Sequence, residues 1–169
     1  GNYSLSLGGS NTFEIVGLGQ STADFRSKAP GNFSSVATWE YDQGGNSWVN
    51  ATQAPGSNNN VSISHAVTLV QNFTVGSGKS FTRASGGSFT VNPDQTITVA
   101  GSANFGGQLV TFKSDATGYG SLGQVTGSLS GATNVTVERF IPNVGFRSWR
   151  LLSVPTSGSQ TIRQSWQEN

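Results

Sequence analysis

Short runs in which apolar and polar residues alternate recur through the middle of this 169-residue chain. Each run is a triplet, as in Phe73-Thr74-Val75, and Gly, Ser, Asn, Pro or Asp separates it from the next, which favours one short strand and one turn per unit. The first residues of successive triplets stand eight positions apart, which does not match the seven-residue repeat of a coiled-coil helix. The glycine and β-branched content also opposes a helix. In each triplet we expect the first residue to face inward, Thr to face outward and Val to face inward again. The first residues are Phe73, Phe81, Phe89 and Ile97.

These units predict an all-β fold, a right-handed parallel β-helix (solenoid) with short strands or hairpins as terminal caps. Three units make one coil of roughly 24 residues, which is the size class of solenoid repeats. Antiparallel pairing, as a meander or a β-sandwich, is the alternative, and Ser85-Gly86-Gly87 suits the tight turn that it needs. Further strands are expected at 61–64, 67–70, 109–113 and 125–129.

The pattern changes along the chain and predicts three parts. Residues 1–20 are expected to hold a hairpin that ends a preceding domain or caps the next, because Gly8 to Asn11 separates two alternating runs. Residues 21–133 are expected to form the solenoid with an aromatic cap loop. Residues 134–169 hold longer apolar runs and are expected to be an incomplete C-terminal strand module or a cap.

Composition narrows the functional class. Charged residues are only 10% of the chain and the net charge is +1, so there is no long-range attraction to nucleic acid. Cys is absent, which excludes disulfides and thiolate metal sites, and no apolar run is long enough to span a bilayer as a helix. Because Met is also absent, we expect a processed protein or a piece of a longer one.

A set of specific motifs runs through much of the chain, at residues 21–28, 31–33, 37–40, 46–49, 54–55, 61–69, 134–142 and 149–155. Together these motifs resemble the β-solenoid segments of very large secreted surface proteins of Bacteroidota, the adhesin-like proteins exported by a type IX route. The resemblance covers roughly residues 21–166, with Phe33 where that pattern more often has Trp. It implies an extracellular or cell-surface location and transfers no catalytic residue.

Residues that could carry chemistry are sparse. Asp94 and Asp115 are the only acids between residues 56 and 133, and both stand among turn formers, whereas glycosidases and calcium sites need clustered carboxylates. His65 is the only histidine, and we expect it to pack at a strand end under the aromatic cap. We therefore predict no catalytic residue, no cofactor site and no metal site.

Two sets of side chains have both a functional and a structural interpretation. The threonines at 74, 82, 90 and 98 could form an ordinary outward column, an array that binds ice or another crystal, or a sugar-facing surface; the ordinary column is favoured. Aromatic side chains could stack on sugars, although packing in a cap is the favoured role. The possible ligand or packing aromatics are Trp39, Tyr41, Trp48 and Trp149.

The sequence thus favours a non-catalytic structural or adhesive segment of a large extracellular surface protein, with filament formation as one option. The alternative is a carbohydrate-binding module of a secreted protein that acts on polysaccharides. The expected partners are further copies of the chain or neighbouring domains of the same long chain, with polysaccharide as an option. Nucleic acid and a membrane span are not expected.

Overall fold

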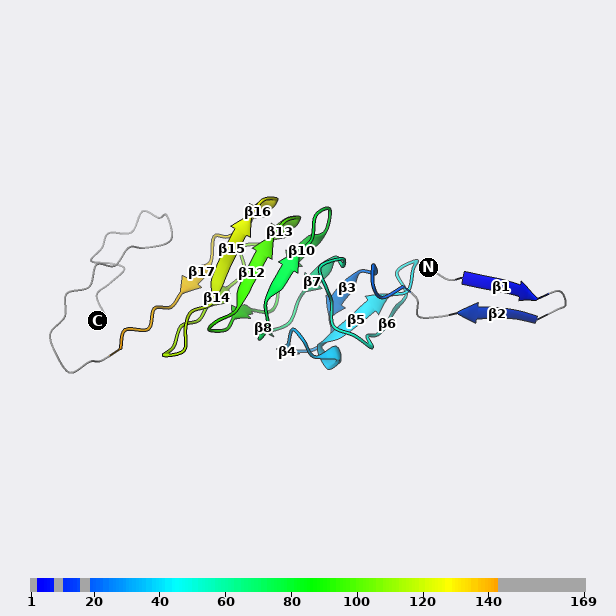
Figure 1. Cartoon of the computed structure of the whole chain (residues 1–169), viewed down its shortest axis with the longest axis horizontal. Helices are drawn as coiled ribbons and strands as arrows, with labels where there is room; N and C mark the ends of the chain where they lie inside the picture. Colours follow the sequence, from blue (N-terminus) through cyan, green and yellow to red (C-terminus); the bar gives the residue numbers. More distant parts are fainter. Residues whose placement is uncertain (1–2, 8–10, 16–18, 143–169) are drawn as a thin grey trace.

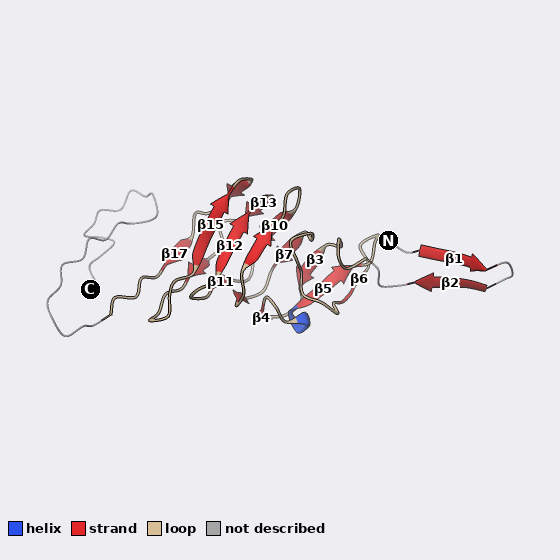
Figure 2. Ribbon diagram, in the orientation of Figure 1, coloured by secondary structure: helices blue, strands red, loops and turns tan. Residues whose placement is uncertain are grey.

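The computed structural model describes residues 3–7, 11–15 and 19–142, and residues 19–142 form a parallel β-solenoid with three faces. Figure 1 shows its coils stacked side by side along the long axis. The predicted solenoid is confirmed, and the antiparallel sandwich is wrong, because neighbouring coils pair through parallel strands. Figure 2 shows strands throughout and one short helical segment within the described residues, the 3-10 turn η1 (Val36–Thr38).

The strands follow one another coil by coil. The first coil holds β3 (Phe25–Ser27) and β4 (Gly31–Asn32), followed by η1 and by an insertion with β5 (Trp39–Asp42) and β6 (Trp48–Asn50). The second holds β7 (Val61–Ile63), β8 (Val67–Leu69) and β9 (Phe73–Val75). The third holds β10 (Ser80–Arg83), β11 (Phe89–Val91) and β12 (Thr96–Val99), and the fourth holds β13 (Ser102–Asn104), β14 (Val110–Phe112) and β15 (Ser121–Val125). A fifth coil begins with β16 (Ser128–Ser130) and β17 (Val135–Val137).

Each face of the solenoid is one sheet. The first sheet has the strand order β16-β13-β10-β7-β3-β5-β6, the second has β17-β14-β11-β8-β4, and the third has β15-β12-β9. Val61 pairs with Phe81 twenty residues on, and Ala103 pairs with Leu129 twenty-six residues on. The coil length therefore varies around the predicted value, and the variation lies in the turns between the strands.

Alternation along each strand builds the interior. The outer two residues of β7, β8, β9 and β11 are buried, whereas the middle residue is partly or fully exposed. Phe73 lies beside Ile97 of the next coil, and Phe89 lies beside Val67, so apolar side chains stack from coil to coil. Ring contacts cross between faces, with the Phe81 and Phe89 centroids 5.0 Å apart. The predicted inward and outward positions are thus confirmed.

Glycine is required where successive coils touch at a corner. A Cβ atom on Gly101 would lie 2.2 Å from the carbonyl oxygens of Gly76 and Lys79 in the preceding coil. A Cβ atom on Gly127 would meet the Gly101 carbonyl oxygen in the same way. The turns between the third and first sheets therefore stack backbone directly on backbone.

The aromatic cap is more regular than the sequence predicts. Instead of a loop, β5 and β6 form an antiparallel hairpin that extends the first sheet beyond β3. A turn at Gly44, Gly45 and Asn46 joins the two strands, and all three residues have positive φ angles. Asp42 accepts hydrogen bonds from the backbone N–H groups of Gly44, Asn46 and Ser47, which explains the polar sequence here. The predicted N-terminal hairpin is also present, as β1 (Tyr3–Leu7) paired antiparallel with β2 (Asn11–Ile15).

Two expectations about the last coils are wrong. Residues 125–129 are not one strand, because β15 ends at Val125 and the turn through Gly127 leads into β16. The solenoid also continues past the predicted boundary at residue 133, since Val135, Thr136 and Val137 pair with β14. This triplet repeats the apolar-Thr-apolar unit, although longer apolar runs follow it in the sequence. Residues 143–169 of the predicted C-terminal module lie outside the described residues.

The interior stacking predicts a large difference between adjacent residues of β11. Phe89 is fully buried, so replacement by Ala should lower the free energy of unfolding by about 3–5 kcal/mol. Thr90 is outward and half-buried, and Thr90→Ala should cost less than about 1 kcal/mol. Urea denaturation followed by tryptophan fluorescence measures both. Equal losses for the two variants would contradict the assignment of inward and outward positions.

Candidate functional site

Two of the four singled-out aromatic residues belong to the core. Trp39 is completely buried, and its Nε1 donates a hydrogen bond of 2.8 Å to the carbonyl oxygen of Phe33. The Trp39 ring lies edge-on to the Phe33 ring with centroids 5.1 Å apart. Tyr41 is also buried and packs beside Phe25. Neither ring presents a face to solvent, so both close the first coil of the solenoid.

Trp48 has a different environment. It is half-buried on the outer face of β6, and the guanidinium carbon of Arg26 lies 4.2 Å from the ring centroid. Its Nε1 donates a hydrogen bond to the side chain of Asn46. Trp149 lies outside the described residues, so Trp48 is the singled-out aromatic residue that the structure places at the surface.

Polar side chains surround Trp48 on the outer face of β3, β5 and β6. Arg26 forms an ion pair with Glu40, with Nε and Oε1 2.5 Å apart. Lys28 donates a hydrogen bond of 2.6 Å to the Asn50 side chain. Strand register brings these groups together, because Arg26 pairs with Glu40 and Glu40 pairs with Asn50. We call this set the Trp48 patch: Arg26, Lys28, Glu40, Trp48 and Asn50.

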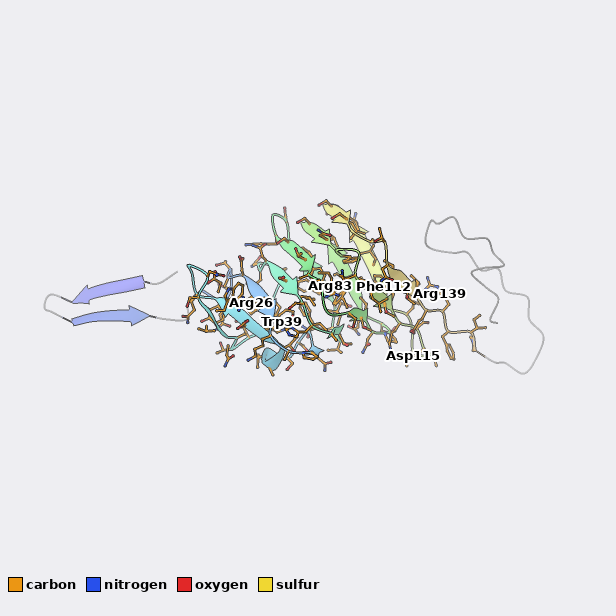
Figure 3. All side chains as sticks on the ribbon, turned by 180° about the vertical axis from the view of Figure 1, so that it is seen from behind. Arg26, Trp39, Arg83, Phe112, Asp115 and Arg139 are labelled. Atoms are coloured by element: carbon orange, nitrogen blue, oxygen red, sulfur yellow. The ribbon has the colours of Figure 1, made fainter. Side chains whose placement is uncertain are left out.

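The Trp48 patch combines an aromatic ring with planar or cationic polar groups. It lies at the insertion end of the solenoid, where Figure 3 labels Arg26, a member of the patch, near Trp39. Arg stacked on Trp gains from cation–π attraction. Amide, carboxylate and guanidinium groups next to an aromatic face are suited to hydroxyl-rich ligands, which need an apolar ring face and several hydrogen bonds at once.

His65 stands at a strand end, as predicted, and its ring contacts serine side chains. It lies at the corner between β7 and β8, where its Nδ1 is 3.0 Å from Oγ of Ser27 and 3.3 Å from Oγ of Ser64. Ser27 Oγ also accepts the backbone N–H groups of Ser64 and His65. These two N–H groups need an acceptor at the corner, and the Ser27 hydroxyl of the preceding coil supplies it, so this serine connects the first two coils. The surroundings of His65 therefore depend on how the coils stack, which the sequence spacing does not reveal.

The two isolated acids lie in turns. Asp94 is exposed and has a positive φ of 60°, a conformation that Asp tolerates better than most residues. Asp115 accepts hydrogen bonds from the backbone N–H and the hydroxyl of Thr117, and these bonds lower the pKa of the carboxyl group. Among the described residues, no three His, Cys, Asp or Glu side chains lie close enough to hold a metal ion.

The threonines at 74, 82, 90 and 98 do not form one column. Each coil contributes one triplet to each face, so only Thr74 and Thr98 are neighbours, on the third sheet. Thr82 lies on the first sheet and Thr90 on the second. A longer column does exist on the second sheet, where paired strands align four outward threonines: Thr68, Thr90, Thr111 and Thr136.

Arg83 is a feature that the sequence did not predict. The triplet Phe81-Thr82-Arg83 places it at an inward position, and it is 1% exposed. Its guanidinium donates hydrogen bonds to the carbonyl oxygens of Ile63 and Gly87, and Nε is the one buried side-chain nitrogen or oxygen among the described residues with no partner. Burial lowers the pKa of Arg83 through desolvation. The sequence signal for its burial is its third place in a triplet, where other units have Val.

An apolar cavity of about 530 Å³ opens at the end of the solenoid formed by the last coils. Figure 3 labels Phe112 and Arg139 at this end. Tyr119 stands at the cavity with 60% of its surface exposed, and the Arg139 guanidinium lies 5.4 Å from its ring centroid. The other apolar side chains that line it are Phe105, Phe112, Leu122, Leu129, Ala132, Val135 and Val137.

The fold and these surfaces define a three-faced parallel β-solenoid with one covered end and one open end. No family model matches the chain, and a search of curated proteins and of solved structures found no match either. No helix in the described part of the chain is long and apolar enough to cross a membrane.

Arg83 provides a test of what a buried cation contributes. Met has a similar length and no charge, so Arg83→Met removes the desolvated guanidinium. The carbonyl oxygen of Ile63 still accepts a hydrogen bond from the backbone N–H of Ala84. We expect the free energy of unfolding to change by less than about 1 kcal/mol. Arg83→Glu turns a carboxylate toward carbonyl oxygens and should cost more than about 3 kcal/mol or prevent folding. Thermal and urea unfolding compare the two; a large loss for Met would show that the hydrogen bonds outweigh the desolvation.

Proposed function

We propose that this chain is a non-catalytic structural segment, a rigid spacer, within a large extracellular surface protein. The observation that carries the proposal is the stacked solenoid, in which each coil contacts only its neighbours and length grows by repetition. A spacer needs a fixed distance between its ends, and continuous parallel pairing across β3, β7, β10, β13 and β16 supplies it.

The chemistry of the described side chains supports the same role. Asp94 and Asp115 are exposed in turns, and His65 is engaged by serine hydroxyls. A hydrolase or lyase of this shape would need paired carboxylates or a metal-binding cluster. The extracellular location is proposed from the resemblance of segments such as 61–69 to secreted surface proteins.

Fibre formation by stacking of ends is disfavoured at one end of the solenoid. There, Trp39 and Tyr41 fill the interior and the β5–β6 hairpin covers the edge of β3. A second copy stacking on this end would find no open apolar interior. We therefore favour a spacer within one long chain over a filament subunit.

Rigidity can be measured with spin labels, because the chain contains no native Cys. Asn50 and Ser130 are exposed on the two edge strands of the first sheet, six strand spacings apart in the strand order. At about 4.8 Å per spacing, labels at Asn50→Cys and Ser130→Cys should be separated by about 29 Å with a narrow distance distribution. Double electron–electron resonance gives that distribution.

Urea-unfolded protein serves as the control and should give a broad distribution of spin-label distances. A broad distribution in native buffer would reject the rigid spacer. Turnover of any polysaccharide in a panel of acidic and neutral substrates would reject the non-catalytic part of the proposal.

A second candidate function, binding of a carbohydrate chain, is favoured by the Trp48 patch. The exposed part of Trp48 and the neighbouring Asn50, Glu40 and Lys28 offer ring contact and hydrogen bonds together. Such a surface suits a neutral polysaccharide because Arg26 is paired with Glu40 and only the charge of Lys28 is left unbalanced within the patch.

A glycan array on the purified chain tests this second function. If it binds, Trp48→Ala should weaken the affinity at least about tenfold, the loss of about 1.4 kcal/mol that one aromatic contact supplies. Tyr119→Ala removes an exposed aromatic ring at the opposite end and should leave binding unchanged. Equal effects of the two substitutions, or no saturable binding to any glycan, would reject the Trp48 patch as a sugar site.

A further inference from the structure

The open end of the solenoid exposes positions that are buried in every coil before it. On the third sheet, Ile97 is completely buried, whereas Leu122, its neighbour in the next coil, is 38% exposed. Val99 is likewise completely buried, and Val125 beside it is 38% exposed. These side chains still point toward the interior column, but no described segment covers them.

The other two faces show the same change at the same end. On the first sheet, Ala103 is buried and Leu129, its partner, is half-buried. On the second sheet, Phe112 is buried and its partner Val137 is half-buried. The three strands β15, β16 and β17 also end their sheets, so each has an edge with no paired strand among the described residues. The surface therefore has the features of a solenoid coil that lacks its successor.

The path of the chain leads to this surface. Arg139 lines the cavity, and the backbone N–H of Phe140 donates a hydrogen bond of 2.9 Å to Ser114 Oγ. The backbone N–H of Glu138 donates a hydrogen bond to the carbonyl oxygen of Phe112. The chain is thus fixed at the rim of the open end just before residue 143.

The length and pattern of the following segment fit one more coil. Residues 143–169 are 27 residues, and the preceding coil takes 25 residues between Val110 and Val135 on the second sheet. The segment contains the apolar-polar-apolar triplets that make strands elsewhere, in Trp149-Arg150-Leu151 and Leu152-Ser153-Val154. Their outward positions would carry Arg and Ser, as polar residues do on the other coils.

We propose that residues 143–154 of the same chain dock on the open end and close it, with apolar side chains seated against Leu122, Val125 and Leu129. A tethered segment has an effective concentration in the millimolar range. It therefore outcompetes a second copy of the chain at micromolar protein. This inference does not rest on the spacer function, since a closed monomer and an end-to-end dimer are both compatible with a rigid solenoid.

Disulfide trapping in the full chain tests the docking, because no native Cys competes. Leu122→Cys is combined with either Leu151→Cys or Arg150→Cys, adjacent residues that stand at an inward and an outward position of the first triplet and so face opposite sides of a strand. We expect the Leu151 pair to form an intramolecular disulfide under mild oxidation and the Arg150 pair to react at least about tenfold more slowly. The matched control is Val36→Cys with the same partners, since Val36 is an exposed apolar residue at the insertion end and should not cross-link.

A fluorescence measurement covers the case in which cysteine geometry prevents the bond. With Trp48→Phe and Trp166→Phe, two tryptophans remain: Trp39, which is buried, and Trp149. Acrylamide quenching should be weak, and Leu129→Asp should raise it at least about twofold while Val36→Asp leaves it unchanged.

Two results would overturn the proposal. Disulfide-linked dimers in place of the intramolecular product, with mass rising with concentration, would assign the open end to a second copy. Absence of both cross-links together with strong quenching of Trp149 in the monomer would show an uncovered end.

Discussion

The whole structure depends on parallel pairing between one coil and the next. A three-residue strand cannot bury its own side chains, and it becomes part of a core only when strands of neighbouring coils lie beside it. Pairing of β7, β10 and β13 puts Val61, Phe81 and Ala103 in one column, and each is almost completely buried. The hydrophobic effect and the backbone hydrogen bonds therefore act together, and neither is available to an isolated coil.

The corners between faces set a second constraint, because turning the chain leaves backbone groups that the strand ladders do not satisfy. Side chains from the preceding coil take over this role. Asn60 Oδ1 accepts the backbone N–H of Ser80, and Asn72 Oδ1 accepts the backbone N–H of Thr96. Ser27 does the same for Ser64 and His65. Much of the polar sequence between the triplets thus has a structural role.

This division of roles explains which features the sequence predicted. The alternation in Phe73-Thr74-Val75 and its relatives reports burial within a single strand, so the strands and their inward positions were predictable. Stacking between coils depends on the number of residues in every turn, which has no comparable pattern. For that reason the threonines at 82 and 90 were assigned to one column although they lie on different sheets.

The candidate site was less predictable, for the same physical reason. Trp39 and Trp48 stand nine residues apart in similar polar surroundings, yet one is completely buried and the other lies on the outer face. Pairing of β3 with β5 and of β5 with β6 decides the difference, since it alternates Trp39 and Tyr41 inward with Glu40 outward. The burial of Arg83 is hard to predict because its residue type suggests the surface, whereas its place in the triplet is interior.

The two ends of the solenoid differ in the kind of contact that each can make. At the insertion end, the aromatic rings of Phe33, Trp39 and Tyr41 occupy the interior, and the polar side chains of the Trp48 patch outside them are paired by hydrogen bonds and an ion pair. At the other end, the interior itself is exposed through Leu122 and Val125. Weak, reversible contact with a hydrated ligand suits the first surface, because little apolar area needs covering there. The second surface requires a permanent cover, and a continuation of the same chain is the cover that costs the least entropy to place.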